Sequence, residues 1–580
     1  MKYSDLKQLA YRTGATHLLD WMGVRGSVSE WARFLIDAAE REKWRAIRQD
    51  YIACREQFQR LSQGAPTGGP EKVAWIVSAL QTVWSLKMDG VISLAVRLRD
   101  FRPVAVHLSS DSWSRRYHQL SGIRHFLYFE RFLAMDSITR PAPEIHDFVG
   151  SRPRVSDLLE LTYRDVDVGR IALSNVLNRN KFARFDLAQA ETLAEVAAEL
   201  FKIQRNILAA EGMVAHQRPR IALFLEKGLS PAAEIFGVCV ARGIPVVQYV
   251  GSQRMDGFVL KRLNRHNRHQ HPFSLDNGSW DRVKRMPWGP GREAELMREF
   301  EESYRKGSWF NRKFLHEGKR IKSAEEVRRQ LGLDPTKKTA VIFSHVLWDA
   351  TFFYGRGLFD DYETWLLETV RAACANPRVN WVIKLHPDLV WKLKHEDYAG
   401  ELRDIIAVRS AVGKLPEHVR IVPPDTDINT FSFFEITDYC VTVRGTIGIE
   451  MACYGVPVLT AGTGRYAGMG FTVDSSSAEE YLHRLSRIDA TLPMSRAQRE
   501  LARRFAYALF KLRPWSMQSF EWIKMPIEKT VHPLGDNLVP HVEDYSQFAQ
   551  AEDMRRFADW VASDETDYLE SDAVGSGEVS

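Results

Sequence analysis

The sequence has no apolar run long enough to cross a bilayer. No window approaches the roughly 18 uninterrupted apolar residues that a transmembrane helix needs. The N-terminus, MKYSDLKQLAYRTGATHLLDW, also lacks the apolar core of a secretory signal peptide. These absences predict a cytoplasmic protein, at most peripheral to the inner face of the plasma membrane.

Cysteine is scarce, and no cysteine is placed as a metal ligand. The five cysteines stand singly in apolar surroundings, with no CxxC pair and no histidine at ligand spacing. This pattern predicts buried thiols in a reducing compartment. An excess of one charge is lacking too, because 79 basic residues nearly balance 74 acidic ones. We therefore expect no nucleic-acid partner.

Two nucleotide-binding motifs are missing. No GxxxxGK[ST] sequence occurs, which excludes P-loop chemistry. No GxGxxG follows the first strand of either predicted sheet, which disfavours redox chemistry with a dinucleotide. The sequence thus predicts neither a cofactor nor a metal.

A chain of 580 residues is too long to fold around a single hydrophobic core, and its length predicts about two to four domains. Composition and periodicity divide the chain into four parts. These are a helical N-terminal segment over 1–65, a Rossmann-like domain over 66–310, a second Rossmann-like domain over 311–512, and C-terminal helices with an acidic disordered tail over 513–580. The tail is expected to begin at Asp564.

Strands that alternate with helices predict parallel sheets in both central parts. The first series of strands is expected at 73–77, 104–107, 221–225 and 245–249. The second series is expected at 340–344, 381–385, 419–422, 439–443 and 456–460. The predicted fold class is α/β, with two Rossmann-like domains that face a cleft.

A stretch near the end of the second series carries the clearest binding motif. Arg444, Gly445 and Thr446 follow a buried strand and open a helix, so free amides there suit the phosphates of a nucleotide. Glu450 lies one helical turn further, where a carboxylate can accept hydrogen bonds from ribose hydroxyls. The alternative is an ordinary strand–helix–strand crossover in which Glu450 is solvated.

Two further strands of this series end in polar residues, Ser344-His345 and His386-Pro387. Parallel strands present their carboxyl ends on one side of a sheet, so these residues should meet the helix start at Arg444. Each histidine alone fits a structural role equally well. Three strands that all end in ligand-competent groups predict a binding site between them.

These motifs resemble a known family. A strand ending in His-Pro, the sequence TxRGTxGxE at a helix start, a GxPV strand and YAGxGFT are similar to the bacterial capsular polysaccharide biosynthesis glycosyltransferases, including those that transfer Kdo. The resemblance is strongest over 338–485. It implies the two-domain GT-B architecture, a nucleotide-sugar donor bound by the second domain, and a C-terminal helix that crosses back to the first.

The resemblance also assigns residues by position. His386 and Pro387 match the His-Pro motif, and Gly445, Thr446, Gly448 and Glu450 match the helix start that binds the donor. The glycine-rich loop includes Gly468. Kdo-transferring members usually carry a serine at the turn and a tryptophan between the last glycines, where this sequence has Arg444-Gly445-Thr446 and Met469. This departure argues against Kdo as the sugar.

The chemistry of sugar transfer fits the same residues. Negative charge builds on the leaving phosphate, so a catalyst needs donors already in place around it. The helix-start amides, Arg444, His345 and His386 can supply them without a metal. Two acidic triplets, Asp165-Val166-Asp167 and Asp425-Thr426-Asp427, are not expected to bind a metal. The first lies among charges far from any strong strand, and Asp427 stands where a helix over 429–435 needs an N-cap.

A catalytic base is expected from the first domain. The better candidates are Glu226, directly after a strand, and Asp256, in a following loop. A capping or solvated-loop role competes with catalysis for both, and no single base can be chosen.

The basic, aromatic segment 254–285 has three interpretations. It can contact an anionic membrane, bind an anionic glycan acceptor, or form a solvated connector. RNA binding is disfavoured because no RNA-binding motif accompanies it.

The predicted function is transfer of a sugar from a nucleotide-sugar donor to a glycan or glycolipid acceptor in surface polysaccharide biosynthesis. Two alternatives stay open. A non-hydrolysing nucleotide-sugar epimerase would use the same architecture without an acceptor, and a scaffold of a capsule assembly complex would bind nucleotide weakly or not at all.

Overall fold

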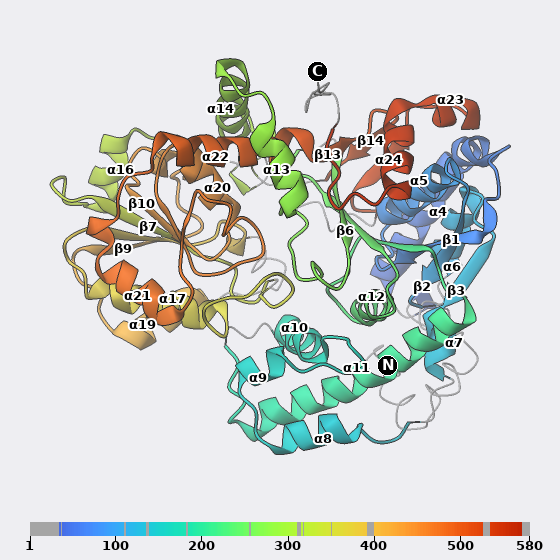
Figure 1. The fold of residues 1–580 in the computed structure, drawn as a ribbon, viewed down its shortest axis with the longest axis horizontal. Coiled ribbons are helices and arrows are strands. Elements are labelled where there is room, and N and C mark those ends of the chain that lie inside the picture. Colours follow the sequence, from blue (N-terminus) through green and yellow to red (C-terminus); the bar gives the residue numbers. More distant parts are fainter. Residues whose placement is uncertain are drawn as a thin grey trace.

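The computed structural model describes residues 34–35, 37–109, 112–134, 138–180, 184–254, 257–309, 312, 315–316, 318–349, 351–390, 400–525 and 534–570. The chain forms two separate β-sheets flanked by helices, which lie side by side in Figure 1. A third, smaller group of helices lies below them in the same view. Two Rossmann-like α/β domains therefore face each other, as the sequence predicts.

The first domain contains a seven-stranded sheet of order β13-β6-β5-β4-β1-β2-β3. Its strands are β1 (Gly69–Ser78), β2 (Phe101–His107), β3 (His125–Tyr128), β4 (Ile221–Phe224), β5 (Val246–Gly251), β6 (Gly257–Leu263) and β13 (Pro514–Ser516). Strands β1 to β5 are parallel, and β6 and β13 are added antiparallel at one edge. The central strands are buried on both faces, which explains their continuous apolar runs.

Helices cover this sheet and extend beyond it. Helices α4 (Ala38–Ser62), α5 (Val83–Arg97), α6 (Ser112–Leu120) and α12 (Ala232–Ala241) belong to the sheet domain. Five more, α7 (Phe129–Ala134), α8 (Pro143–Gly150), α9 (Val155–Leu159), α10 (Val168–Asn180) and α11 (Ala190–His216), form the lower group. The strand pattern predicts none of these five. Helix α10 is buried on most of its surface, so its sequence lacks the polar stripe that marks a surface helix.

The second domain contains a six-stranded parallel sheet of order β12-β11-β10-β7-β8-β9. Its strands are β7 (Thr339–Phe343), β8 (Asn380–Lys384), β9 (Val419–Val422), β10 (Tyr439–Thr442), β11 (Val458–Thr460) and β12 (Val473–Asp474). The helices of this half are α13 (Asn277–Arg285), α14 (Pro290–Arg305), α16 (Ala324–Leu331), α17 (Tyr362–Cys374), α19 (Arg403–Val412), α20 (Thr446–Cys453) and α21 (Ala478–Ser486). The five predicted strands correspond to β7 through β11 within about two residues.

The chain then returns to the first domain. Helix α22 (Arg496–Tyr507) runs from one domain toward the other along the upper side of Figure 1 and continues through a π-helical turn, Ala508–Leu512, into β13. Beyond it lie the hairpin β14 (Phe520–Ile523) and β15 (Asn537–Pro540) and the helices α23 (Tyr545–Gln550) and α24 (Glu552–Ala562). The crossing helix implied by the family resemblance is present, and three strands accompany it.

The prediction of a disordered tail from Asp564 is wrong for residues 564–570. Asp567 is fully buried, with Oδ1 2.7 Å from Nζ of Lys261 and 3.3 Å from Nη2 of Arg513. Two buried cations need a buried anion, and the tail supplies it. Residues 571–580, like residues 1–33 of the predicted N-terminal segment, lie outside the described residues.

No helix within the described part of the chain is both long and apolar enough to span a bilayer.

Candidate functional site

A cavity of about 270 Å³ lies at the carboxyl edge of the second sheet. Strands β7, β8 and β10 are neighbours or near neighbours in this sheet and all run in the same direction. The residues after each strand therefore meet at one edge. Ser344, His386 and Arg444, from three different strand ends, all line the cavity.

Eight of the nine predicted donor-binding residues line this cavity. They are Ser344, His345, His386, Pro387, Arg444, Gly445, Thr446 and Glu450. Gly468 is the exception, because it is exposed in a turn and its amide donates to Oδ2 of Asp474 at 2.7 Å. The structure brings the strand-end residues together and leaves Gly468 outside the lining.

His345 supports the helix start through a chain of hydrogen bonds. The amide of Gly445 donates to Oγ1 of Thr442 at 3.3 Å, and Oγ1 of Thr442 lies 3.2 Å from Nε2 of His345. The amide of Val443 also donates to Nε2 of His345 at 3.3 Å, so the ring proton belongs on Nδ1. Burial holds the pKa of His345 well below its usual range. This imidazole is neutral.

Helix α20 begins at this edge with Gly445 as its N-cap. Because the Gly445 amide is engaged by Thr442, the amides of Thr446 and Ile447 are the ones without an intrahelical acceptor at the mouth. Tyr466 fixes the helix start from the other side, since its hydroxyl donates to the carbonyl of Gly445 at 2.8 Å. An added Cβ at Gly448 would lie 2.3 Å from this hydroxyl, so the glycine serves close packing.

Two arginines give the cavity its positive character. Arg444 is 6% exposed, and its Nε and Nη1 atoms have no hydrogen-bond partner among the described residues. Arg465 donates from Nη1 to the carbonyl of Arg444, and its Nε is likewise buried without a partner. Burial lowers the pKa of Arg465 to about 10, so it stays charged at neutral pH. Buried donors without a partner favour an anionic ligand.

At the opposite end of the cavity, Glu450 is bound to residues of the segment before the sheet. Its Oε2 atom accepts a hydrogen bond from the Tyr304 hydroxyl at 3.0 Å and lies 2.6 Å from Nη2 of Arg312. Glu450 is 1% exposed, and its burial raises its pKa above the usual range. The guanidinium of Arg312 also stacks on the Tyr304 ring, with its central carbon 3.6 Å from the ring centre.

The end of β8 places two more basic groups at the cavity. The amide of Asp388 donates to Nδ1 of His386 at 3.2 Å, which leaves the imidazole proton on Nε2. The His386 amide donates to Oγ of Ser344, joining two strand ends. Lys384 is buried with Nζ 2.9 Å from the carbonyl of Leu385, and burial lowers its pKa to about 7.

The first domain also contributes to the cavity. His271 follows β6, lines the cavity, and donates its amide to the carbonyl of Gly464 in the second domain at 2.8 Å. Its ring lies 4.5 Å from that of Tyr354, on the loop after β7. Nearby, the amide of Gly355 donates to the carbonyl of His269 at 2.7 Å. The cavity is therefore closed on one side by contacts between the domains.

The structure describes one of the two candidate catalytic bases. Glu226 lies after β4, and its Oε1 accepts hydrogen bonds from the amides of Lys227 and Gly228 at 2.7 and 2.6 Å. It is not among the residues that line the cavity. Asp256 lies outside the described residues.

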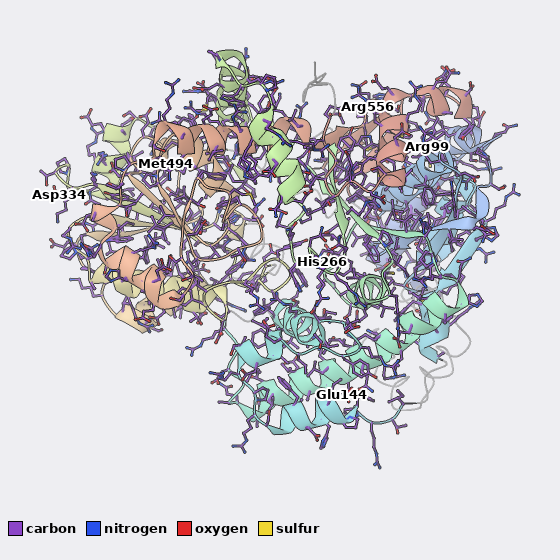
Figure 2. The ribbon with its side chains drawn as sticks, viewed as in Figure 1. Arg99, Glu144, His266, Asp334, Met494 and Arg556 are labelled. Atoms are coloured by element: carbon purple, nitrogen blue, oxygen red, sulfur yellow. The ribbon has the colours of Figure 1, made fainter. Side chains whose placement is uncertain are left out.

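The acidic triplets occupy different settings. Asp167 forms an ion pair with Arg268 at 2.7 Å. The pair lies where the two domains and helix α10 meet, close to His266, which is labelled near the centre of the molecule in Figure 2. Asp427 pairs with Lys322 instead of capping a helix. Asn429 caps the short 3₁₀ helix Thr430–Phe433 in its place, because its side chain accepts from the amide of Phe431. The predicted N-cap at Asp427 is wrong.

Most cations of the segment 254–285 are engaged within the molecule. Arg262 donates to carbonyls of the C-terminal segment, Arg268 pairs with Asp167, and Arg282 pairs with Glu565. This pairing reduces the charge that the segment can offer to a membrane or a glycan. A membrane contact by this segment stays a prediction.

Several lining residues carry no strand-end motif. They are His271, Tyr304, Arg312, His316, Asp349, Tyr354, Tyr362, Lys384 and Arg465. The sequence could have indicated Lys384, because this residue directly precedes the Leu-His-Pro end of a predicted strand. Arg465 stands in the glycine-rich loop beside the residues singled out there. The others come from segments whose approach to the sheet is decided only by the tertiary fold.

The family model of the capsule polysaccharide biosynthesis proteins matches residues 304–507. This segment contains the whole second sheet and most of the cavity lining. The resemblance predicted from the sequence motifs is thus confirmed for the second domain. No curated protein matches the chain.

Solved structures give distant likenesses. KpsC of Thermosulfurimonas dismutans, a β-Kdo 2,4-transferase, is 13% identical and has a TM-score of 0.29, covering 57% of this chain and 88% of its own. A UDP-GlcNAc 2-epimerase of Neisseria meningitidis is 11% identical with a TM-score of 0.24, covering 76% and 96%. The Anabaena protein HepE, solved with UDP-glucose, is 11% identical with a TM-score of 0.26, covering 84% and 99%.

Proposed function

We propose that the protein is a glycosyltransferase of capsular or surface polysaccharide biosynthesis. It moves a sugar from a nucleotide-sugar donor to a glycan or glycolipid acceptor. One observation carries the proposal: in the segment that matches the capsule family, the strand ends line a cavity with Arg444 and Arg465, whose buried guanidinium nitrogens include three without a hydrogen-bond partner among the described residues. An anionic ligand satisfies both.

In this proposal the donor phosphate lies between Arg444, Arg465 and the first amides of α20. Two guanidinium groups and a helix N-terminus stabilise the charge that develops on the leaving phosphate. The Nε2–H of His386 adds a further donor at the rim. The neutral His345 then acts through Thr442, by holding the helix start in position.

The nucleoside lies toward Glu450, where Tyr304, Arg312 and Lys384 line the cavity. Glu450 accepts hydrogen bonds from ribose hydroxyls, and the guanidinium of Arg312 beside it favours the ionised carboxylate against the effect of burial on its pKa. Tyr304 and Arg312 both donate to Oε2 of the carboxylate, which suits a role for Oε1 toward the ligand.

The acceptor enters from the first domain. Glu226 and Asp256 stay the candidate bases. The proposed reaction needs no metal. The two guanidinium groups and the helix-start amides stabilise the charge on the leaving phosphate in its place.

Ligand-induced thermal shifts test the donor site. The protein would be melted with CMP, UDP and GDP and with sugars carried on each of them, and a specific donor should raise the melting temperature. Arg444→Met should abolish the shift, whereas Arg487→Met, at an exposed position of the same domain, should retain it. No shift with any member of the panel would favour the scaffold alternative.

Product analysis separates the two enzymatic alternatives. A donor that gives a shift would be incubated with and without a membrane or polysaccharide fraction as acceptor. Transfer of label to that fraction supports the transferase. Conversion of the nucleotide sugar to an isomer without any acceptor would instead identify an epimerase.

A further inference from the structure

Helix α4 presents a basic face with an exposed isoleucine at its centre. Ile52 is 61% exposed, although it lies in the middle of a helix of 25 residues. Arg45, Arg48 and Arg55 stand seven and four residues before it and three residues after it, so all three share its face of the helix. All three are exposed, and none has an ion pair with any described residue.

The opposite face of α4 anchors the helix to the domain. Ile47, Cys54 and Phe58 are buried, and Asp50 turns inward to the buried Lys87 at 2.8 Å. The inward acid leaves the outer face with an excess of positive charge. Glu56, the acidic residue beside Ile52, is paired with Arg60 on the same helix at 2.9 Å.

Helix α6 extends the basic face. It packs against α4 through Trp113, whose ring lies 5.7 Å from that of Tyr51. Arg116 lies over the Trp113 ring at 5.0 Å, and both Arg116 and Arg115 are exposed. The acidic residues Glu543 and Asp544 directly precede α23. This segment lies on another side of α4 than Ile52, where the side chain of Gln57 donates to the carbonyl of Pro540.

We propose that this face of α4 and α6 docks the protein on a bilayer surface that contains anionic lipids. Cations on a surface helix are attracted to anionic headgroups, and an exposed aliphatic side chain among them can enter the headgroup region. A nucleic-acid backbone would use the arginines and leave the isoleucine without a partner. The segment 254–285 lacks this property, because its cations are largely paired within the molecule.

The position of the face suits a peripheral enzyme. Figure 1 shows α4 and α6 at the end of the first domain, remote from the second sheet, whose carboxyl edge holds the cavity. Docking through this end leaves the donor cavity open to solvent. Docking by this face is independent of which sugar the protein moves, and it is measured without any transfer assay.

Sedimentation with lipid vesicles tests the proposal. The full chain would be mixed with vesicles of phosphatidylcholine alone and with vesicles of an equal mixture of phosphatidylcholine and phosphatidylglycerol. We expect binding only to the mixed vesicles, weakening as salt is raised. The triple variant Arg45→Gln, Arg48→Gln, Arg55→Gln should bind roughly 100-fold more weakly, at about fivefold per cation.

A matched control removes the same charge elsewhere. Arg329, Arg487 and Arg496 are exposed on the second domain, and their replacement by Gln should leave vesicle binding unchanged. Ile52→Asp should weaken binding by roughly tenfold or more while leaving the circular dichroism spectrum unaltered. Equal binding by the triple variant and the control would overturn the proposal, as would no binding by the wild-type chain.

A competition separates lipid from nucleic acid. If poly(U) displaced the protein from vesicles and Ile52→Asp bound both as well as the wild type, the face would be a general anion site and the bilayer assignment would be wrong. Loss of vesicle binding by Ile52→Asp with unchanged affinity for poly(U) supports the bilayer.

Discussion

The buried pair of Glu450 and Arg312 allows the binding and structural roles of a single carboxylate to be separated. Glu450 is 1% exposed and Arg312 7% exposed, and their closest atoms are 2.6 Å apart. Glu450→Gln removes the negative charge and leaves the guanidinium buried without its counter-ion. Removing one partner of a buried pair costs about 3–5 kcal/mol. The amide oxygen of glutamine still accepts a hydrogen bond from Tyr304. We therefore expect the free energy of unfolding to fall by an amount near the lower end of this range.

The same change should weaken donor binding. A carboxylate that accepts from ribose hydroxyls makes charge-assisted hydrogen bonds, worth about 1.5–3 kcal/mol, so the donor Kd should rise by roughly ten- to hundredfold. Turnover at saturating donor should change much less, because ribose contacts are alike in the ground and transition states.

A second variant distinguishes the two effects. Arg312→Met in the Glu450→Gln background removes the uncompensated charge and should restore much of the lost stability, but it should not restore donor affinity. Urea unfolding gives the stabilities, and titration calorimetry with the donor identified by thermal shift gives the affinities.

Two results would refute the reasoning. If Glu450→Gln were as stable as the wild type, the pair would contribute nothing to the fold. If donor affinity were unchanged while kcat collapsed, Glu450 would take part in the chemistry and the nucleoside would lie elsewhere.

Three further predictions concern the same cavity. His386→Ala should lower donor binding or transfer by roughly tenfold or more in a folded protein, since it removes one charge-assisted hydrogen bond, and wild-type kinetics of this variant would contradict the proposed rim contact. Lys384, whose pKa is lowered to about 7 by burial, is protonated below that pH, so affinity for the anionic donor should fall as pH rises through about 7. Lys384→Met should flatten that dependence in calorimetric titrations, and an unchanged profile would show that another group is responsible. Transfer activity should persist in EDTA, and its abolition with recovery on addition of Mg²⁺ or Mn²⁺ would identify a metal site that was wrongly dismissed.

The sequence alone determined the second sheet and the meeting of its strand ends. Buried parallel strands are short, apolar and bounded by turn residues, so β7 through β11 are visible as local patterns. Strand direction is shared in a parallel sheet, and this rule places Ser344, His386 and Arg444 at one edge without any coordinates. Residues that follow a strand directly are therefore the part of the site that sequence predicts best.

The tertiary structure alone decided which distant segments complete the cavity. Arg312 reaches Glu450 across 138 positions of the chain, and His271 reaches the second domain through Gly464. Such contacts depend on how helices and domains pack, and no local period encodes that packing. Gly468 shows the converse, since its motif is intact but the loop turns it to solvent.

The structure of residues 564–570 likewise depends on the tertiary fold, for an energetic reason. A short acidic stretch near a chain end has the composition of a solvated tail, and composition alone predicts disorder. Asp567 is ordered because Lys261 and Arg513 are buried around it, and two buried cations are costly without an anion. That requirement arises only when β6 and β13 come together as neighbouring strands, so only the folded chain could reveal it.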